Sequence, residues 1–334
     1  MPNFPSQMAF FLQLSMYGYL ILSGKGMKPF RKNVAIAIDG GGMRGIIVTQ
    51  ALAVLETALN KPAGSIFRLA AGTSTGSIIS AGIAAGIPAA RMTQLYITMG
   101  QTVFPNSLQK AVFPLSRWRY PSEPLTAALD AHFGSLTMSD FWQADPQIDV
   151  VITAYDLQQN HTLFIKPWKA EYADWPVSKA VQASCTVPTY FPVLDGRYVD
   201  GGVGAYANPC YVAAYEAREC LKWDPAETTL ISIGTGREPY TYDSADAPRL
   251  WAWDWIGRAM GIFQQSAYDQ QVHLVESNFA GLDFRRFQVN LREPIAMDDT
   301  RQLPRLLAYG SRLGHMILNG QVDPIQGLSP KQPL

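Results

Sequence analysis

Two short apolar runs each end in a glycine-rich turn that leads directly into a helical pattern. The first run, VAIAI at 34–38, is followed by DGGGMRG at 39–45 and then by apolar residues at helical spacing. The second run, IFRLAAG at 66–72, is followed by TSTGS and by a helical segment of small residues at 77–87. Strand, turn and helix repeated in this order predict an α/β fold, with a parallel sheet and helices on its faces.

Further strand and helix patterns continue this alternation along the chain. Strands are expected at 147–157, 197–202 and 228–236, and helices at the start of 179–193 and in 207–220. Residues 104–145 are rich in proline and aromatic side chains and lack a clear period, so we expect an irregular insertion or lid there. The tail, 240–334, shows helical patterns and the aromatic cluster WAWDWI.

Composition excludes several classes of function. The 334 residues suffice for a large core without disulfides, and the formal net charge of zero gives no electrostatic reason to expect a nucleic-acid partner. Cys185, Cys210 and Cys220 have no C-x-x-C spacing and are typical of buried thiols in a reducing, cytoplasmic compartment. The four histidines show no metal-ligand spacing, so we expect no metal and no cofactor site.

The N-terminus differs from the rest of the chain. The apolar stretch at 8–23 has sixteen residues, which is short for a membrane span, and no Lys or Arg precedes it as in a signal peptide. A segment that begins at Met27 reads as an ordinary cytoplasmic start. We therefore expect residues 1–26 to be an extension outside the folded unit; the alternative is a flexible or membrane-touching peptide.

The first glycine cluster has two interpretations. Gly40, Gly42 and Gly45 satisfy the G-x-G-x-x-G pattern of dinucleotide-binding folds. Such a fold needs an acidic residue at the end of its second strand to hold the ribose, and AAGTSTG contains none. The sequence therefore disfavours dinucleotide binding.

The second glycine cluster predicts a nucleophile. Gly72-Thr73-Ser74-Thr75-Gly76 matches G-x-S-x-G and lies between an apolar strand and a helix, which is the context of a nucleophile elbow. Acyl transfer from an ester then needs N–H donors aimed at the developing oxyanion. The first glycine cluster supplies them, with Gly41 and Gly42 as the main candidates and the N–H of Thr75 as a third.

The serine needs a base, and the best candidate is Asp200 in YVDGG. It ends an apolar strand, and burial raises the pKa of a carboxyl toward the range of a general base. A turn aspartate that caps DGG is the alternative. His273 and His315 follow the serine in the order of a Ser-Asp-His esterase, although each fits a helical packing or surface position. Arg44 either steadies the glycine loop, attracts an anionic head group, or is an exposed residue of a first helical turn.

Three motifs, taken in order, resemble the patatin-like phospholipases: DGGGMRG at 39–45, GTSTG at 72–76 and YVDGGVGAYANP at 198–209. ASCTVPTYFPV, ISIGTG and FQVNLREPIAMDD are similar to other stretches of that family. The third motif has Asp-Gly-Gly where many relatives have Asp-Gly-Ala. The resemblance extends from about residue 33 to residue 315.

The resemblance implies a three-layer α/β/α sandwich with a mainly parallel central sheet. The catalytic domain would span 27–334, with core motifs at 33–236 and a helical, aromatic part at 237–334. A Ser–Asp dyad without histidine would consist of Ser74 as nucleophile and Asp200 as base. The oxyanion hole would comprise Gly40, Gly41, Gly42, Met43 and Thr75, supported by the motif residues Arg44, Gly45, Gly72, Gly76, Gly201 and Gly202.

The expected activity is hydrolysis of acyl esters in phospholipids, lysophospholipids or related glycerolipids. The partner would be a membrane lipid or lipid aggregate, so the protein would be cytoplasmic or peripheral at membranes. Some relatives need an activating partner or small molecule. A lipid transacylase would use the same dyad, and a lipid-binding module would show no turnover. Residues 104–145 and the tryptophans Trp251, Trp253 and Trp255 would line the acyl channel or contact a membrane, unless they pack in the core.

Overall fold

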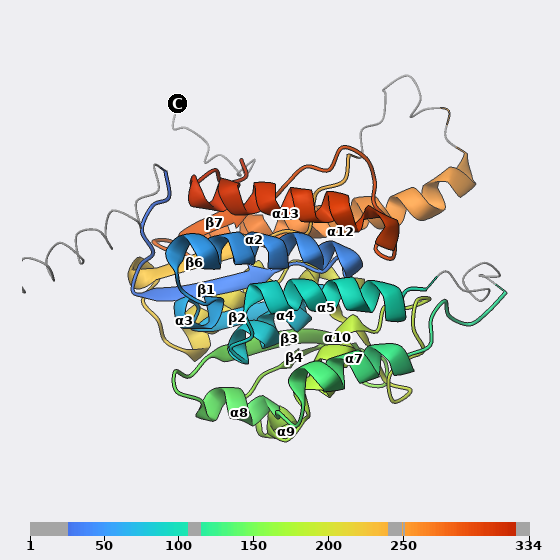
Figure 1. The fold of residues 1–334 in the computed structure, drawn as a ribbon, viewed down its shortest axis with the longest axis horizontal. Coiled ribbons are helices and arrows are strands. Elements are labelled where there is room, and N and C mark those ends of the chain that lie inside the picture. The colour runs from blue at the N-terminus through green and yellow to red at the C-terminus, as the bar shows by residue number, and fades with distance from the viewer. Residues whose placement is uncertain (1–25, 106–114, 240–248, 250, 325–334) are drawn as a thin grey trace, which may run out of the picture.

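The computed structural model describes residues 26–105, 115–239, 249 and 251–324, with side chains described for all of these except 252–254 and 256–260 (Figure 1). The expected N-terminal extension therefore lies outside the described residues, apart from Gly26. The side chain of Trp253 also lies outside them.

In the described part of the chain, seven strands form one sheet in the order β4-β3-β2-β1-β6-β7, with β5 paired to β3. Strands β1, β2, β3, β6 and β7 are parallel, whereas β4 and β5 run antiparallel to β3. The predicted mainly parallel sheet is confirmed. The strands are β1 (Asn33–Ile38), β2 (Leu69–Thr73), β3 (Asp149–Asp156), β4 (His161–Ile165), β5 (Tyr198–Asp200), β6 (Thr228–Ile233) and β7 (Asp283–Phe287).

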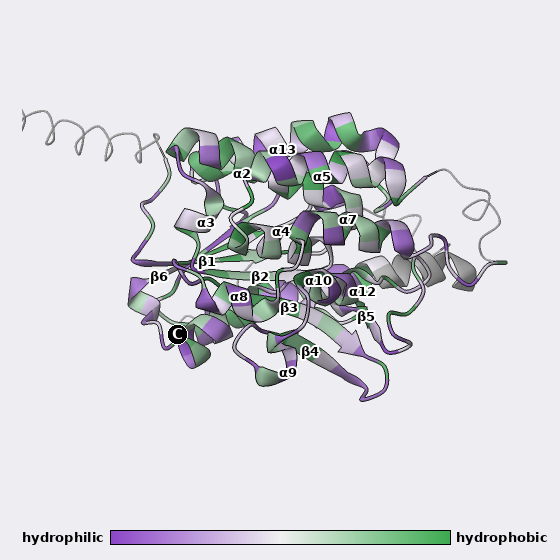
Figure 2. Cartoon of the chain, turned by 60° about the horizontal axis from the view of Figure 1, so that its bottom comes forward, coloured by the Kyte–Doolittle hydropathy of each residue, from purple (hydrophilic) through white to green (hydrophobic). Residues whose placement is uncertain are grey.

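Alternating side chains of the central strands point into two separate hydrophobic cores. Ile36 and Ile38 of β1 belong to the larger core, and Ala35 and Ala37 belong to the smaller one. Strands β2, β3 and β6 divide their apolar side chains in the same way, so both faces of the sheet are covered and the central strands β1 and β2 are mainly hydrophobic (Figure 2). This arrangement is the three-layer sandwich.

More helices pack on the face of the sheet with the larger core than on the face with the smaller core. The larger core is packed by α2 (Gly45–Leu59), α3 (Ala63–Ile66), α4 (Thr75–Ala84), α5 (Ala89–Thr102), α7 (Glu123–Phe133), α8 (Met138–Gln143), α9 (Ala170–Ala173), α10 (Val177–Cys185) and α13 (Leu303–Leu318). The smaller core is packed by α11 (Cys210–Tyr215), which continues as a π-helix at Glu216–Cys220, and by the C-terminal half of α12 (Ala252–Asn278).

Among the described helices, only the continuous stretch Gly42–Leu59, which includes α2, is long and apolar enough to cross a membrane. This stretch lies inside the core, where α13 packs along it (Figure 1). The packing is close, because a Cβ atom added at Gly310 of α13 would lie 2.7 Å from the carbonyl oxygen of Ile47. Burial between the sheet and α13 accounts for its apolar composition.

Three sequence expectations are corrected. Residues 104–145 are not irregular throughout, because α7 and α8 lie within them, and Leu125, Leu129 and Phe133 of α7 are buried at helical spacing. The second strand begins at Leu69 rather than at residue 66, because Ala63–Ile66 form α3. The tail contains β7, which went unpredicted because its sequence DFRRF carries charged residues; their side chains are buried in ion pairs.

Candidate active site

Ser74 occupies a sharp turn between β2 and α4. Its backbone has φ 54° and ψ −125°, a conformation that a side-chain-bearing residue adopts only under strain. A Cβ atom at Gly72 would lie 2.1 Å from the carbonyl oxygen of Gly76, and one at Gly76 would lie 2.1 Å from that of Ile38. The G-x-S-x-G pattern therefore follows from the space that this turn leaves.

Neighbouring serines hold Ser74 in place. Its backbone N–H donates to the hydroxyl of Ser184, at 2.8 Å, and its carbonyl oxygen accepts from the hydroxyl of Ser77, at 2.6 Å. Ser184 belongs to α10, so this helix is tied to the turn. Strain in the Ser74 backbone is thus maintained by contacts on both sides of the residue.

Sheet register brings Asp200 close to this turn. On one edge of β3, Thr153 pairs with Thr73 of β2 and the next residue, Ala154, pairs with Asp200 of β5, while β4 occupies the opposite edge. Asp200 is the last residue of β5 and is buried. Its Oδ1 accepts from the N–H of Gly202 at 2.7 Å, within the short 3₁₀ turn Gly201–Val203. Ser74, which follows β2, and Asp200, the last residue of β5, are therefore brought together at one edge of β3 although they are 126 positions apart in the sequence.

Burial gives Asp200 the pKa of a base. Desolvation raises the pKa of Asp200 to about 7, while hydrogen bonds from Ser74 and from the Gly202 N–H act in the opposite direction. The second oxygen, Oδ2, has no partner of ordinary hydrogen-bond geometry in the described residues. The carboxyl thus has no cation to hold it ionised, and the hydroxyl of Ser74 lies near enough to act on its pKa.

The glycine loop lies against Ser74, because a Cβ atom at Gly40 would be 3.3 Å from the Cβ of Ser74. Two of its N–H groups are occupied by carbonyl oxygens: Gly40 donates to Ala207 at 2.9 Å and Met43 donates to Met297 at 2.8 Å. Of the residues expected in the oxyanion hole, Gly40 and Met43 therefore have amides that are already hydrogen-bonded. These two hydrogen bonds attach the glycine loop to the segments that contain Ala207 and Met297.

Other amides of the turn remain available. Within the described chain, the N–H groups of Gly41, Gly42 and Thr75 donate to no acceptor. Gly42 has φ +57°, a backbone conformation that favours glycine, and Thr75 is the first residue of α4. Gly45 begins α2, so two helix N-termini point toward this region.

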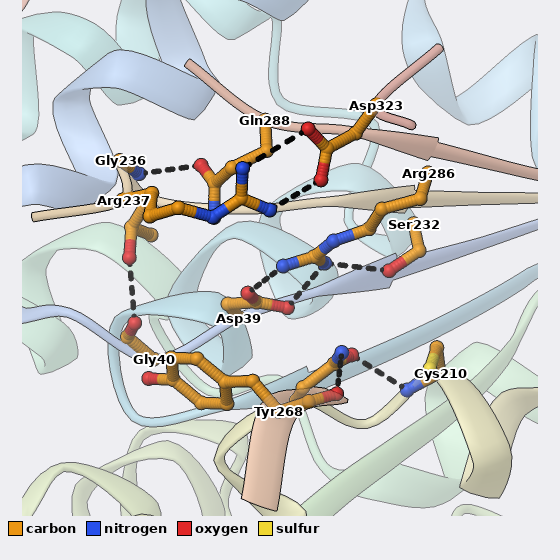
Figure 3. A network of polar contacts seen from close by, with 12 residues as sticks. Asp39, Gly40, Cys210, Ser232, Gly236, Arg237, Tyr268, Arg286, Gln288 and Asp323 are labelled. Atoms are coloured by element: carbon orange, nitrogen blue, oxygen red, sulfur yellow. Dashed lines mark hydrogen bonds and ion pairs between the residues drawn. The ribbon is translucent and has the colours of Figure 1, made fainter. Parts of the chain in front are cut away.

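A buried ion pair fixes the start of the loop. Arg286 of β7 donates from Nη1 to Oδ1 of Asp39 at 2.8 Å and from Nη2 to Oδ2, and it also donates to the hydroxyl of Ser232 at 2.7 Å (Figure 3). Burial raises the pKa of Asp39, and the guanidinium of Arg286 opposes that rise. The carbonyl of Gly40 accepts from the hydroxyl of Thr235 at 2.7 Å. The sequence analysis did not identify Arg286. An arginine within a short strand was the only local sign that a buried ion pair forms here.

Arg44 is also buried, and its Nη1 donates to Oε1 of Glu238 at 2.6 Å. The alternative of an exposed first-turn arginine is therefore wrong. The guanidinium joins the glycine loop to the segment that follows β6.

An apolar cavity of about 40 Å³ opens at Ser74. This volume holds only a few water molecules. Residues of the 104–145 region contribute Phe104 and Leu125 to its wall. The full lining is Gly42, Met43, Ser74, Thr75, Ile78, Tyr96, Met99, Phe104, Leu125, Cys185, Val187, Tyr190, Phe191 and Met297.

The two candidate histidines lie elsewhere. His273 of α12 lines a separate cavity of about 580 Å³, which Arg237 and Asp323 also line, and His315 is exposed in the last turn of α13. Neither lines the cavity at Ser74. In the portion of the chain that the structure describes, no three His, Cys, Asp or Glu side chains converge as metal ligands.

The family model for patatin-like phospholipases matches residues 36–214, more than half of the chain. The chain belongs to the patatin-like phospholipase family. The matched region contains the glycine loop, Ser74 and Asp200.

Similar proteins are named phospholipases. The chain is 29% identical over 224 residues to an intracellular phospholipase A2 of Caenorhabditis elegans, covering 62% of this chain and 20% of the relative. It is 28% identical over 228 residues to a cGAMP-activated phospholipase of Escherichia coli, covering 62% and 63% of the two chains. Against the calcium-independent phospholipase A2-gamma of Oryctolagus cuniculus the identity is 26% over 326 residues, covering 90% and 39%. The chain thus spans less than two thirds of each of these relatives.

Among solved structures, VipD from Legionella pneumophila aligns with 88% of this chain and 67% of its own, at a TM-score of 0.45 and 13% identity.

Proposed function

We propose that this patatin-like protein hydrolyses carboxylic ester bonds of phospholipids, lysophospholipids or related acyl glycerolipids through an acyl-enzyme on Ser74, with Asp200 as the general base. The proposal rests mainly on the pairing of Ser74 with Asp200. Ser74 has a strained backbone, and its hydrogen bond acts on the pKa of the buried Asp200 carboxyl, which is about 7 and has no cation beside it. Membership of the family supports lipid acyl esters as the substrate class.

In the first half of the reaction, Ser74 Oγ attacks the ester carbonyl carbon while its proton passes to Asp200. The carbonyl oxygen becomes an oxyanion and accepts N–H donation from Gly41, Gly42 and Thr75, whose amides are otherwise unused. Collapse of the tetrahedral intermediate breaks the ester C–O bond. The leaving alcohol takes the proton from Asp200, which returns to its ionised form.

In the second half, water attacks the acyl carbon and gives its proton to Asp200. The same donors hold the second oxyanion. The C–O bond to Ser74 then breaks, Ser74 Oγ takes the proton back, and the fatty acid leaves. Asp200 accepts and returns a proton twice in each cycle, which requires a pKa near neutral pH.

The apolar wall around Ser74 is suited to the start of an acyl chain. Because the cavity is much smaller than such a chain, we propose that substrate binding moves part of this wall. Phe104 and Leu125 come from the region expected to act as a lid. We also propose that the catalytic unit begins at Met27, whose side chain is buried in the larger core.

The experiment is labelling with a fluorophosphonate, a serine-directed phosphorylating probe, read by intact mass. We expect a single label on the wild-type chain and none on Ser74→Ala, with the exposed Ser65→Ala as the matched control that labels normally. Labelling that survives Ser74→Ala would overturn the proposal.

The assay is repeated with phospholipid vesicles and with a cyclic dinucleotide, because one relative is named a cGAMP-activated phospholipase. Product analysis on phospholipid then separates hydrolysis, which yields free fatty acid, from transacylation, which yields a new ester.

A further inference from the structure

Tyr96 of α5 is a buried tyrosine whose hydroxyl contacts the residue that follows Ser74. This hydroxyl donates to the carbonyl oxygen of Thr75 at 3.0 Å, and it also forms a hydrogen bond with Oγ1 of Thr75. A carbonyl oxygen only accepts, so the tyrosine proton lies toward it, and the Thr75 hydroxyl donates to the oxygen of Tyr96. Burial raises the pKa of Tyr96, which keeps the phenol protonated at neutral pH. One side chain thus holds both oxygens of Thr75.

The start of α2 contacts the same pair. A Cβ atom at Gly45 would lie 2.2 Å from Oγ1 of Thr75 and 2.7 Å from the hydroxyl oxygen of Tyr96, so a side chain here would displace this contact. One helical turn away, the hydroxyl of Thr93 in α5 donates to that of Thr49 in α2 at 2.9 Å. Helix α5 lies against both α2 and α4 (Figure 1). Tyr96 is therefore placed where the N-termini of α2 and α4 meet.

These two N-termini carry the available amides of the candidate site. Gly41 and Gly42 precede α2, Thr75 begins α4, and within the described chain their N–H groups donate to no acceptor. An oxyanion donor is effective when its N–H is aimed at the developing charge before the reaction begins. Ser74, directly before Thr75, has a strained backbone, and strain persists only where surrounding contacts hold it. A Thr75 residue bonded at both oxygens has little freedom to turn its N–H away.

We propose that Tyr96 is a positioning residue of the reaction, whose hydroxyl fixes Thr75 so that the Thr75 N–H points at the oxyanion. This inference rests on the proposed function, because the oxyanion forms only if Ser74 attacks an ester. Tyr96 also lines the Ser74 cavity, yet it acts on the reaction through Thr75. It lies 21 positions after Thr75 and outside the three motifs that contain the site residues.

The experiment compares Tyr96→Phe with the wild type on a short soluble ester and with a trifluoromethyl ketone as inhibitor. Ser74 Oγ adds to the ketone carbon and its proton passes to Asp200, so the ketone oxygen becomes an oxyanion in a tetrahedral adduct that resembles the transition state. We expect kcat to fall about 10–100-fold with KM nearly unchanged, and the inhibition constant to rise by a similar factor, since a displaced donor acts on the oxyanion and not on the bound ester.

Two controls separate positioning from folding. Fluorophosphonate labelling taken to completion counts the active sites, so a smaller amount of folded chain does not lower kcat. The matched variant is Tyr172→Phe, a buried tyrosine of α9 that does not line the Ser74 cavity, and it should behave as the wild type does. The acid limb of the Tyr96→Phe profile should keep its pKa of about 7, because Asp200 is untouched.

A second variant tests the contact from its other side. Thr75→Val removes the hydroxyl that donates to Tyr96, and we expect it to raise the inhibition constant as well. Because the two side chains act as a unit, Tyr96→Phe/Thr75→Val should lose no more than the poorer single variant, rather than the product of the two factors. If Tyr96→Phe does not fold, the kcat and the inhibition constant of Thr75→Val decide instead.

Unchanged kcat and inhibition constant in these variants would overturn the inference. So would a loss confined to KM, a shifted acid limb, or factors that multiply in the double variant. A wild-type chain that neither hydrolyses the ester nor takes the label on Ser74 would overturn the proposed function, and this inference with it. An active wild type beside an equally active Tyr96→Phe would overturn the inference alone.

Discussion

Two aspartates of this protein share a local pattern and differ in their partners. Asp39 directly follows β1 and precedes Gly-Gly-Gly, Asp200 ends β5 before Gly-Gly, and both side chains are buried. Asp39 receives two N–H groups from the buried Arg286, while Asp200 receives one backbone N–H and faces Ser74 without a cation. The Asp39 carboxyl is held in an ion pair, whereas the Asp200 carboxyl has a raised pKa and no cation beside it.

The difference shows how one motif type serves two purposes. A buried carboxyl with a bidentate arginine is held in place. Burial raises the pKa of Asp39, the guanidinium of Arg286 opposes that rise, and the charge of Asp39 raises the pKa of Arg286. A buried carboxyl without a cation keeps a pKa near neutrality and exchanges a proton readily. The paired aspartate anchors the glycine loop, and in the proposed mechanism the unpaired one takes the serine proton.

The largest expected effect comes from removing the unpaired carboxylate. We expect Asp200→Asn to slow fluorophosphonate labelling of Ser74 by about 10²–10⁴-fold, the usual contribution of a general base. The matched control is Asp195→Asn, an exposed aspartate paired with Lys179. The labelling rate of each variant is measured by intact mass. An unchanged rate in Asp200→Asn would show that Asp200 is not the general base.

The same variant should gain stability at high pH. The folded pKa of Asp200, about 7, lies above the ordinary value of 3.8, so its favourable contribution is complete below about pH 4 and is lost as pH rises through 7. Asparagine avoids that loss. Urea unfolding should therefore find Asp200→Asn more stable than wild type by up to about 4 kcal/mol above pH 7, and nearly equal to it below pH 4.

The second effect comes from breaking the paired carboxylate. Arg286→Met leaves the charge of Asp39 buried without a counter-ion, so we expect a loss of about 3–5 kcal/mol in the free energy of unfolding. Labelling of Ser74 should fall as well, because the glycine loop loses its anchor. The double variant Asp39→Asn/Arg286→Met should regain much of the stability. If the double variant is as unstable as the single one, charge burial is not the cause.

Much of this fold follows from local patterns. The first two strands, their glycine turns and α2 were predictable because a strand, a turn and a helix follow one another within 30 residues or so, and each step has its own signal. The family is confirmed by the match of its model to residues 36–214, and the mainly parallel sheet is confirmed by the strand pairing. The roles of Ser74 and Asp200 stay predictions, which the geometry supports through the neighbouring strand ends.

The remainder depends on contacts that are distant in sequence. Gly40 and Met43 look like donors in the sequence, yet their amides are used by the carbonyls of Ala207 and Met297, which no local pattern reveals. Arg286 is similar, since two adjacent arginines in a strand suggest solvent until Asp39 and Asp283 are placed beside them. The sequence favours Gly41, Gly42 and Thr75 as donor candidates, but it does not reveal that the amides of Gly40 and Met43 are occupied.

A smaller effect is the dependence of the reaction on pH. If Asp200 must be ionised, the labelling rate should fall about tenfold for each pH unit below its pKa, which lies at about 7. His273→Ala and His315→Ala should leave this acid limb in place, since neither histidine lines the Ser74 cavity. An acid limb that disappears in either variant would assign the base to that histidine and make the enzyme a Ser-Asp-His esterase.

The smallest effect tests how much of the anchoring of the glycine loop depends on Thr235. Thr235→Val removes the hydroxyl that donates to the carbonyl oxygen of Gly40 while keeping nearly the same shape. We expect a loss of about 1–3 kcal/mol in stability, because that carbonyl is left without this buried donor. Since the Asp39–Arg286 pair and the Gly40 amide still hold the loop, labelling of Ser74 should slow by about tenfold or less. A loss of labelling as large as that of Asp200→Asn would mean that the loop depends on Thr235 more than on the ion pair. The anchoring role assigned to Asp39 would then belong to the turn that follows β6.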